Sequence, residues 1–231
     1  MELNQNPPSG AEVGLIVPKS EQEDWFVLFE FDDVGYVKDD EKDSLNASAI
    51  LQNLQKGTED SNEERRRRGW KPFHINGWYT QPFYDTQTNN LTWAVNGSED
   101  NNQSPVVNYS VRILGRRGTM NVDLVLDPGA VATTEPRFKE LLTGFRFTEG
   151  NRYADFVKGD KVAKYGLTAL IAGGATAVAI KSGLLAKLWK LIVVFIAAIA
   201  GAIKRFWQKL KGGFTGERNP KDEFPSSEVQ K

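Results

Sequence analysis

The stretch VNYSVRILGRRGTMNVDLVL, from Val107 to Leu126, decides the fold of this 231-residue chain. Apolar and polar side chains alternate along both of its halves, which is the period of a β-strand with one buried face. The alternating apolar residues are Val107, Tyr109, Val111, Ile113, Met120, Val122, Leu124 and Leu126. Gly115 and Gly118 bound a short turn between the halves, and a tight turn needs such glycines. The stretch therefore predicts an antiparallel hairpin.

Weaker patterns predict strands and helices on both sides of the hairpin. Strands are expected at residues 25–31, 75–80 and 91–96, where β-branched and aromatic side chains gather between turn residues. A helix is expected at residues 134–143, and a last short strand at 145–148. Runs of strands with helices before and after indicate an α+β domain, an antiparallel sheet with flanking helices, over residues 1–150.

The first helix is predicted from its cap and its apolar stripe. Asp43 or Ser44 is suited to the N-cap. Gly57 is expected to interrupt the helix, with residues 59–68 forming a second helical piece. The apolar stripe, spaced to form one buried face, consists of Ala47, Ile50, Leu51 and Leu54.

Residues 151–211 differ in kind from the rest of the chain, because they are both the most apolar and the most basic part. They contain eleven Lys and Arg against two acids, a balance that suits an anionic membrane surface. Uncharged runs at 165–180 and 191–203 predict a membrane anchor of two helices, at about 161–181 and 184–210. The alternative is a helical hairpin that docks on the soluble domain. Residues 212–231 are polar and are expected to be disordered.

Small residues spaced four apart indicate close packing within this anchor. Glycine and alanine faces let helix backbones approach in lipid, so a homo-oligomer through these faces is a further expectation. The residues are Ala169, Gly173 and Ala177 on the first helix and Ala197 and Gly201 on the second. Lysines and arginines flank both ends of the pair, which predicts a two-span hairpin with the domain on the cytoplasmic side.

Several blocks together resemble a bacterial family of predicted membrane-anchored proteins of unknown function. The blocks are GWYTQPFYD, NYSVRILGRRG and YADFVKGDKVAKYGLTALIAGGA. The resemblance implies a soluble domain tethered to the bacterial inner membrane, and it carries no known activity. It also implies that relatives have a secretory signal and a further stretch of domain before residue 6. For this copy we expect both to be missing. The resemblance implies that relatives with a secretory signal have the domain outside the cytoplasm. A single membrane span is therefore the alternative to two spans.

Candidate catalytic chemistry is sparse. The chain has no cysteine, which excludes disulfides and thiolate metal sites. His74 is the single histidine, and Asp85 is the nearest acid that follows it in the sequence, so a hydrolase built on these two residues is one hypothesis. The acidic run 39–43 lacks the spacing of a calcium loop, and we expect a solvated loop without a metal.

Arginines offer the remaining candidate site. The four arginines at 65–68 follow several acids and are better explained as a charged helix surface than as a nucleic-acid site. Arg112, Arg116 and Arg117 lie on the hairpin and are candidates for binding a carboxylate or phosphate, because guanidinium groups match such anions. An ordinary solvent-facing hairpin is the alternative.

The sequence therefore favours a non-enzymatic binding or scaffold domain tethered to a bilayer, with no cofactor and no nucleic-acid partner. Its protein partner is not indicated. A membrane-bound hydrolase and a membrane-active helical hairpin are the other two hypotheses.

Overall fold

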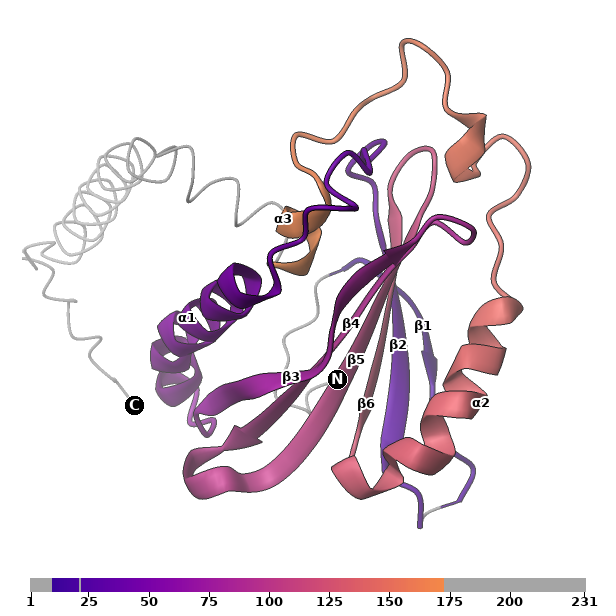
Figure 1. The fold of residues 1–231 in the computed structure, drawn as a ribbon. Helices are drawn as coiled ribbons and strands as arrows, with labels where there is room; N and C mark the ends of the chain where they lie inside the picture. The colour runs from indigo at the N-terminus through magenta and orange to yellow at the C-terminus, as the bar shows by residue number, and fades with distance from the viewer. Residues whose placement is uncertain (1–9, 21, 173–231) are drawn as a thin grey trace, which may run out of the picture. The chain divides into compact units, whose positions relative to one another are not determined.

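A computed structural model of the chain describes residues 10–20 and 22–172. Six strands form one antiparallel sheet in the order β1-β2-β6-β5-β4-β3 (Figure 1). The strands are β1 Glu12–Ile16, β2 Trp25–Asp32, β3 Phe73–Asp85, β4 Asn90–Glu99, β5 Gln103–Leu114 and β6 Thr119–Leu126. The helices are α1 Ala47–Arg67, α2 Val131–Thr143 and α3 Leu167–Ile171, with short 3-10 turns η2 Asp100–Asn102, η3 Pro128–Ala130 and η4 Tyr153–Asp155. The α+β prediction is confirmed.

The predicted hairpin is β5–β6. Its register pairs Val107 with Leu126 and Leu114 with Thr119, and the Gly115 N–H donates to the Gly118 carbonyl at 2.9 Å. Gly118 is required because a Cβ there would collide with the carbonyl oxygen of Asp32 at the end of β2. The turn glycine thus lets the hairpin lie directly beside the N-terminal strands.

The sheet is covered on both faces by two separate apolar clusters. One cluster gathers the alternating residues of β5 and β6 with Val131 and Phe138 of α2. The other gathers Leu91, Trp93 and Val95 of β4 with α1 and α3. Figure 1 shows α1 and α2 on opposite sides of the sheet. Neighbouring residues of β4 therefore alternate between two interiors rather than between an interior and water.

Two details of the first helix differ from the prediction. The N-cap is Asn46, whose Oδ1 accepts from the Ala49 N–H at 3.0 Å, and not Asp43 or Ser44. Gly57 does not interrupt α1, which runs unbroken from Ala47 to Arg67. A glycine costs a helix only about 1 kcal/mol relative to alanine. Packing of the buried face of α1 on the sheet offsets that cost.

The predicted strand at 145–148 is absent. Phe145 and Phe147 pack on the first apolar cluster instead. The chain from residue 144 to 166, here called the strap, returns along the sheet to the loop after β2. Tyr36 and Val162 form a parallel bridge there, with the Tyr36 N–H donating to the Lys161 carbonyl at 2.8 Å.

The strap leads into α3, which belongs to the domain. Leu167, Leu170 and Ile171 are buried in the second cluster. Glu41, from the acidic loop, accepts from the Thr168 N–H at 2.7 Å at the helix start, where a carboxylate is favoured. Residues 161–166, expected to be helical, precede α3 without forming a helix.

Within residues 10–20 and 22–172, no helix has the length and apolar character needed to cross a bilayer. The predicted second anchor helix at 184–210 and the polar tail at 212–231 lie outside the described residues. So do four of the five small residues of the anchor, Gly173, Ala177, Ala197 and Gly201. The fifth, Ala169, lies in α3.

Candidate functional site

His74 is held by two carboxylates from two other elements. Its Nδ1 lies 2.6 Å from Glu59 Oε1 of α1, and its Nε2 lies 2.8 Å from Asp100 Oδ1 of η2. A neutral imidazole has one donor and one acceptor nitrogen, so contacts of this kind on both nitrogens suit the doubly protonated ring. The Asp100 and Glu59 carboxylates raise the pKa of His74, and hydrogen bonding to His74 lowers the pKa of Glu59.

The pairing of His74 with Asp85 in a hydrolase site is wrong. The two residues lie at opposite ends of β3, eleven residues apart and therefore separated by roughly 36 Å along a fully extended strand. Asp85 accepts from the Gln87 N–H and the Thr88 hydroxyl in its own turn, and these bonds lower its pKa. His74, with both nitrogens engaged, is a structural cross-link between elements.

The three hairpin arginines do not converge on one point. Arg112 is largely buried, with Nη1 3.1 Å from Asp123 Oδ2 and the guanidinium 4.9 Å from the Trp93 ring centroid. Asp123 also accepts from the Ser110 hydroxyl. Asp123 therefore neutralises the charge of Arg112, and both side chains are largely buried.

Arg116 and Arg117 occupy the turn, with different surroundings. Arg116 forms a two-pronged pair with Asp160 of the strap, Nε–Oδ2 2.7 Å and Nη2–Oδ1 2.9 Å, and its Nη1 donates to the Gly150 carbonyl. Arg116 lowers the pKa of Asp160 to about 2, assisted by the Val157 N–H. Arg117 is exposed. Of the predicted anion-binding set, Arg117 alone has no side-chain pairing within the described part of the chain.

The two other charged runs serve the structure of the domain. Among the described residues, no group of three or more histidine and acidic side chains could hold a metal ion. In the acidic loop, Asp39 pairs with Lys42 and Glu41 caps α3. In the arginine run, Arg67 and Arg68 both pair with Glu64, while Arg68 also lies over the ring of Trp70.

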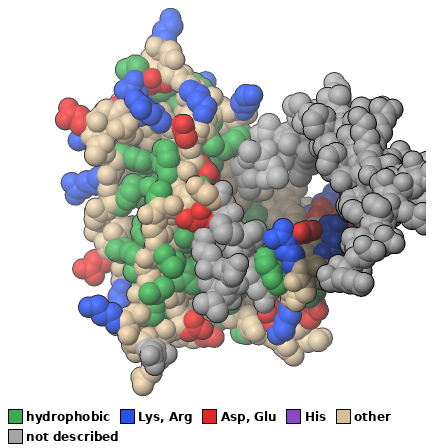
Figure 2. Space-filling view, turned by 180° about the vertical axis from the view of Figure 1, so that it is seen from behind, with side chains coloured by type: hydrophobic (Ala, Val, Ile, Leu, Met, Phe, Trp, Pro, Cys, Tyr) green, Lys and Arg blue, Asp and Glu red, His purple; other side chains and the backbone are tan. Residues whose placement is uncertain are grey.

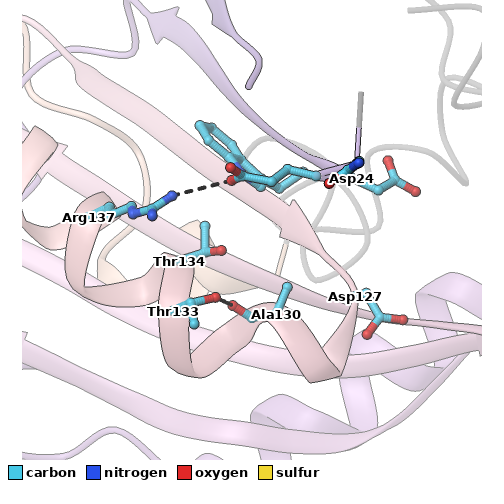
Figure 3. Close-up of a pocket in the computed structure, with 9 residues that line it drawn as sticks. Asp24, Asp127, Ala130, Thr133, Thr134 and Arg137 are labelled. Carbon is cyan, nitrogen blue, oxygen red and sulfur yellow. Dashed lines mark hydrogen bonds and ion pairs between the residues drawn. The ribbon is translucent and has the colours of Figure 1, made fainter. Parts of the chain in front are cut away.

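A hollow of about 480 Å³, which the sequence did not indicate, opens beside the start of α2. Its walls come from the connection between β1 and β2 and from residues 127–137 (Figure 3). Glu23 links two walls, because it pairs with Arg137 of α2 at 3.3 Å and accepts from Trp25 Nε1 at 2.8 Å. The sequence carries no signal for this hollow, because its walls meet only after β2 pairs with β6.

Comparison with known proteins supports the family resemblance. The family model described as "Protein of unknown function (DUF2167)" matches residues 1–204. No curated protein matches the chain. Among solved structures, PA94 of Pseudomonas aeruginosa, described as a protein of unknown function, is similar over 58% of this chain and 82% of its own, at 12% identity and a TM-score of 0.35. Membrane anchoring of the family stays a prediction. Because the family model spans most of the sequence, the chain belongs to the DUF2167 family.

Proposed function

We propose that this protein is a non-enzymatic binding or scaffold protein, tethered to the bacterial cytoplasmic membrane by the hydrophobic segment that follows α3. The observation that supports binding is an exposed apolar strip along the edge strand β1 and the residue that follows it. Val13, Leu15 and Val17 are 62%, 53% and 57% exposed. Single exposed apolar residues are common, but contiguous ones at the edge of a sheet favour an interaction surface.

The register of β1 and β2 gives the direction of the central residue of the strip, Leu15. Ile16 packs on the cluster beneath α2, so Leu15 points to the opposite face, where it lies beside Leu28 of β2. Figure 2, the view from behind, has hydrophobic side chains gathered over the strands that lie behind α2 in Figure 1. A partner strand or a partner's apolar side chains would meet a flat surface there.

Membrane tethering rests on the sequence of the segment after α3, which holds the remainder of the first apolar run, 172–180, the whole second run, 191–203, and the lysines beside them. We expect the protein to sediment with membranes and to resist both carbonate and high salt, because salt screens surface charges but does not extract inserted helices. Release by high salt alone would contradict the tether. A cysteine in place of the exposed Glu140 of α2 tests the side: labelling by an impermeant maleimide in intact spheroplasts would place the domain outward.

Partner binding is tested by photo-cross-linking in native membranes. The double variant Val13→Ser/Leu15→Ser should lose cross-linked protein species that the parent chain forms. Val157→Ser is the matched control, because Val157 is 52% exposed on the strap. Equal cross-linking in the parent chain and both variants would count against the strip as the binding surface.

A further inference from the structure

The strap carries a group of exposed basic side chains at one end of the domain. This surface, here called the basic tip, comprises residues 152–164 together with Arg116 and Arg117 of the β5–β6 turn. It contains six Lys and Arg against two acids. Five of the six cations are exposed, namely Arg117, Arg152, Lys158, Lys161 and Lys164. Figure 2 shows Lys and Arg side chains, with a few acids among them, at the upper end of the domain, which the strap forms in Figure 1.

The two acids of the basic tip are both bonded within the fold. Asp160 forms the two-pronged pair described above, and Asp155 accepts from two backbone N–H groups at 2.8 and 2.9 Å. Beside the tip, the carboxylate of Asp33 lies 3.9 Å from Lys161 Nζ, and the exposed Glu149 precedes the tip in the chain. The cations still outnumber the acids, so this surface attracts anions.

The outermost turn of the basic tip has a fixed shape. The Val157 N–H donates to the Asp160 carboxylate at 2.8 Å, and the Asp160 N–H donates to the Val157 carbonyl at 3.1 Å. Phe156 stacks on Tyr36, with ring centroids 4.2 Å apart. The turn is therefore held from the inside, while Val157 and Lys158 are exposed.

Exposed apolar side chains lie among these cations. Val157 and Val162 are 52% and 40% exposed, and each adjoins an exposed lysine in the sequence. At a membrane surface, apolar side chains enter the boundary between headgroups and acyl chains while Lys and Arg contact anionic headgroups. Surfaces for single-stranded nucleic acid combine cations with aromatic rings on which bases stack. Both aromatic rings of residues 152–158 stack on Tyr36 instead. The composition of the tip therefore favours a lipid surface.

The basic tip is close to the place where the proposed tether begins. Lys164 and Ala172 are eight residues apart, so no more than about 28 Å can separate them. A bilayer that holds the tether is thus within reach of the tip. Because the tether makes this contact intramolecular, individually weak attractions are sufficient.

We propose that the basic tip lies on the anionic headgroups of the bilayer that holds the tether and thereby fixes the orientation of the domain. Arg117, Lys158 and Lys164 contact headgroup phosphates, and Val157 inserts beside them. The inference rests on the proposed tether and adds to it the surface of the domain that faces the lipid.

The test uses the full chain in lipid vesicles, with an environment-sensitive dye on one introduced cysteine, because the chain has none of its own. In Val157→Cys, we expect vesicles of phosphatidylcholine with phosphatidylglycerol to shift the dye emission to the blue and to weaken quenching by acrylamide, which is uncharged. Vesicles of phosphatidylcholine alone should do neither, and high salt should reverse both changes. The matched control is Leu141→Cys on α2, where the parent side chain is 38% exposed and where neither change is expected.

Charge variants in the Val157→Cys chain identify the contacts. Lys158→Gln/Lys164→Gln should lower the ratio of protected to exposed dye on anionic vesicles about fivefold for each lysine removed. Lys19→Gln/Lys56→Gln removes two exposed lysines outside the tip and should leave the ratio unchanged. Equal ratios in the two double variants would overturn the proposal.

The same samples separate this inference from the tether. Flotation with the vesicles and resistance to carbonate report whether the tether is inserted. If the chain is retained but its dye is equally exposed on anionic and neutral vesicles, the inference fails and the tether stands. Release by carbonate would overturn both. Protection on neutral vesicles that appears only after addition of polyuridylic acid would assign the tip to nucleic acid and contradict the lipid contact.

Discussion

At the scale of single residues, α1 is held to the sheet by polar side chains as well as by apolar packing. Asn62 is fully buried in α1. Its Oδ1 accepts from the Phe73 N–H and its Nδ2 donates to the Phe73 carbonyl, both at 2.8 Å. One side chain thereby satisfies both backbone groups of the first residue of β3, as a neighbouring strand would.

Asn62→Ala should destabilise the protein by about 2–5 kcal/mol, because it leaves two backbone groups of Phe73 without partners. Chemical unfolding monitored by tryptophan fluorescence measures the loss. The matched control is Asn53→Ala, at an exposed position of the same helix, which should change stability by less than about 0.5 kcal/mol. Similar values for the two variants would contradict a special role for Asn62.

His74 should make the attachment of α1 depend on pH. Its raised pKa means that the stability it contributes is complete below its ordinary pKa and is lost as the pH rises through the raised value. At the acid end, the contribution of Glu59 is lost as the pH falls through its lowered pKa. The expected size is roughly 0.2–1 kcal/mol for each of these exposed pairs.

Because His74 is the single histidine, its ring signals in a proton NMR titration report this pKa directly. We expect a value above the ordinary one in the parent chain and a lower value in Glu59→Gln. An ordinary value that Glu59→Gln leaves unchanged would refute the bridge. The sequence could not reveal this pairing, since the carboxylates lie 15 and 26 positions away from the histidine.

At the scale of elements, a strand could be predicted from the sequence where its alternation of apolar and polar residues was long and regular. The β5–β6 hairpin was predicted because eight alternating apolar residues and two turn glycines agree. Strand β1 was missed, because it has five residues and one of them is glycine. The alternation of Phe145 and Phe147 suggested a strand, but two phenylalanines can contact a core equally well from an irregular segment.

The strap is fixed to the sheet by a few identifiable contacts. Arg116 binds Asp160, and Tyr153 donates to the Val37 carbonyl at 3.0 Å. The Tyr36 ring stacks on both Tyr153 and Phe156, with ring centroids 4.5 and 4.2 Å away. These contacts bring the chain to the start of α3.

Arg116→Ala should loosen the strap, seen as faster hydrogen exchange over residues 147–163 by mass spectrometry. Arg117→Ala, which removes the adjacent exposed charge, should leave exchange unchanged. Acid should have the effect of Arg116→Ala only when the pH falls from near 4 toward 2, because the pKa of Asp160 is lowered to about 2. Equal exchange in both arginine variants would show that the pair does not hold the strap.

At the scale of the whole molecule, the structure extends the domain beyond residue 150, the end that composition suggested. The change from acidic to basic composition begins in the strap, but the chain there is still part of the fold. Composition reports charge and apolar content, whereas the limit of a domain depends on which side chains are buried together. The burial of Leu167, Leu170 and Ile171 could not be inferred from an apolar run that equally suits a bilayer.

Truncation after Ala172 should therefore preserve the folded domain, while truncation after Gly150 should not. The shorter chain loses three buried apolar side chains, each contributing about 1.5–3 kcal/mol, together with the Arg116–Asp160 pair. Urea unfolding of the two purified fragments gives the comparison. Equal unfolding midpoints would place the end of the domain near residue 150.

The strand order has a consequence for how the chain is made. β2 pairs along its whole length with β6, joining Trp25 to Leu126 and Asp32 to Thr119. A ribosome must therefore release about ninety further residues before the N-terminal hairpin meets its partner, and closing so long a loop is slow. The strands β3 to β6, each adjacent in sequence to the next, can assemble first. Until they do, the aromatic run of β2 is exposed to aggregation or to a chaperone.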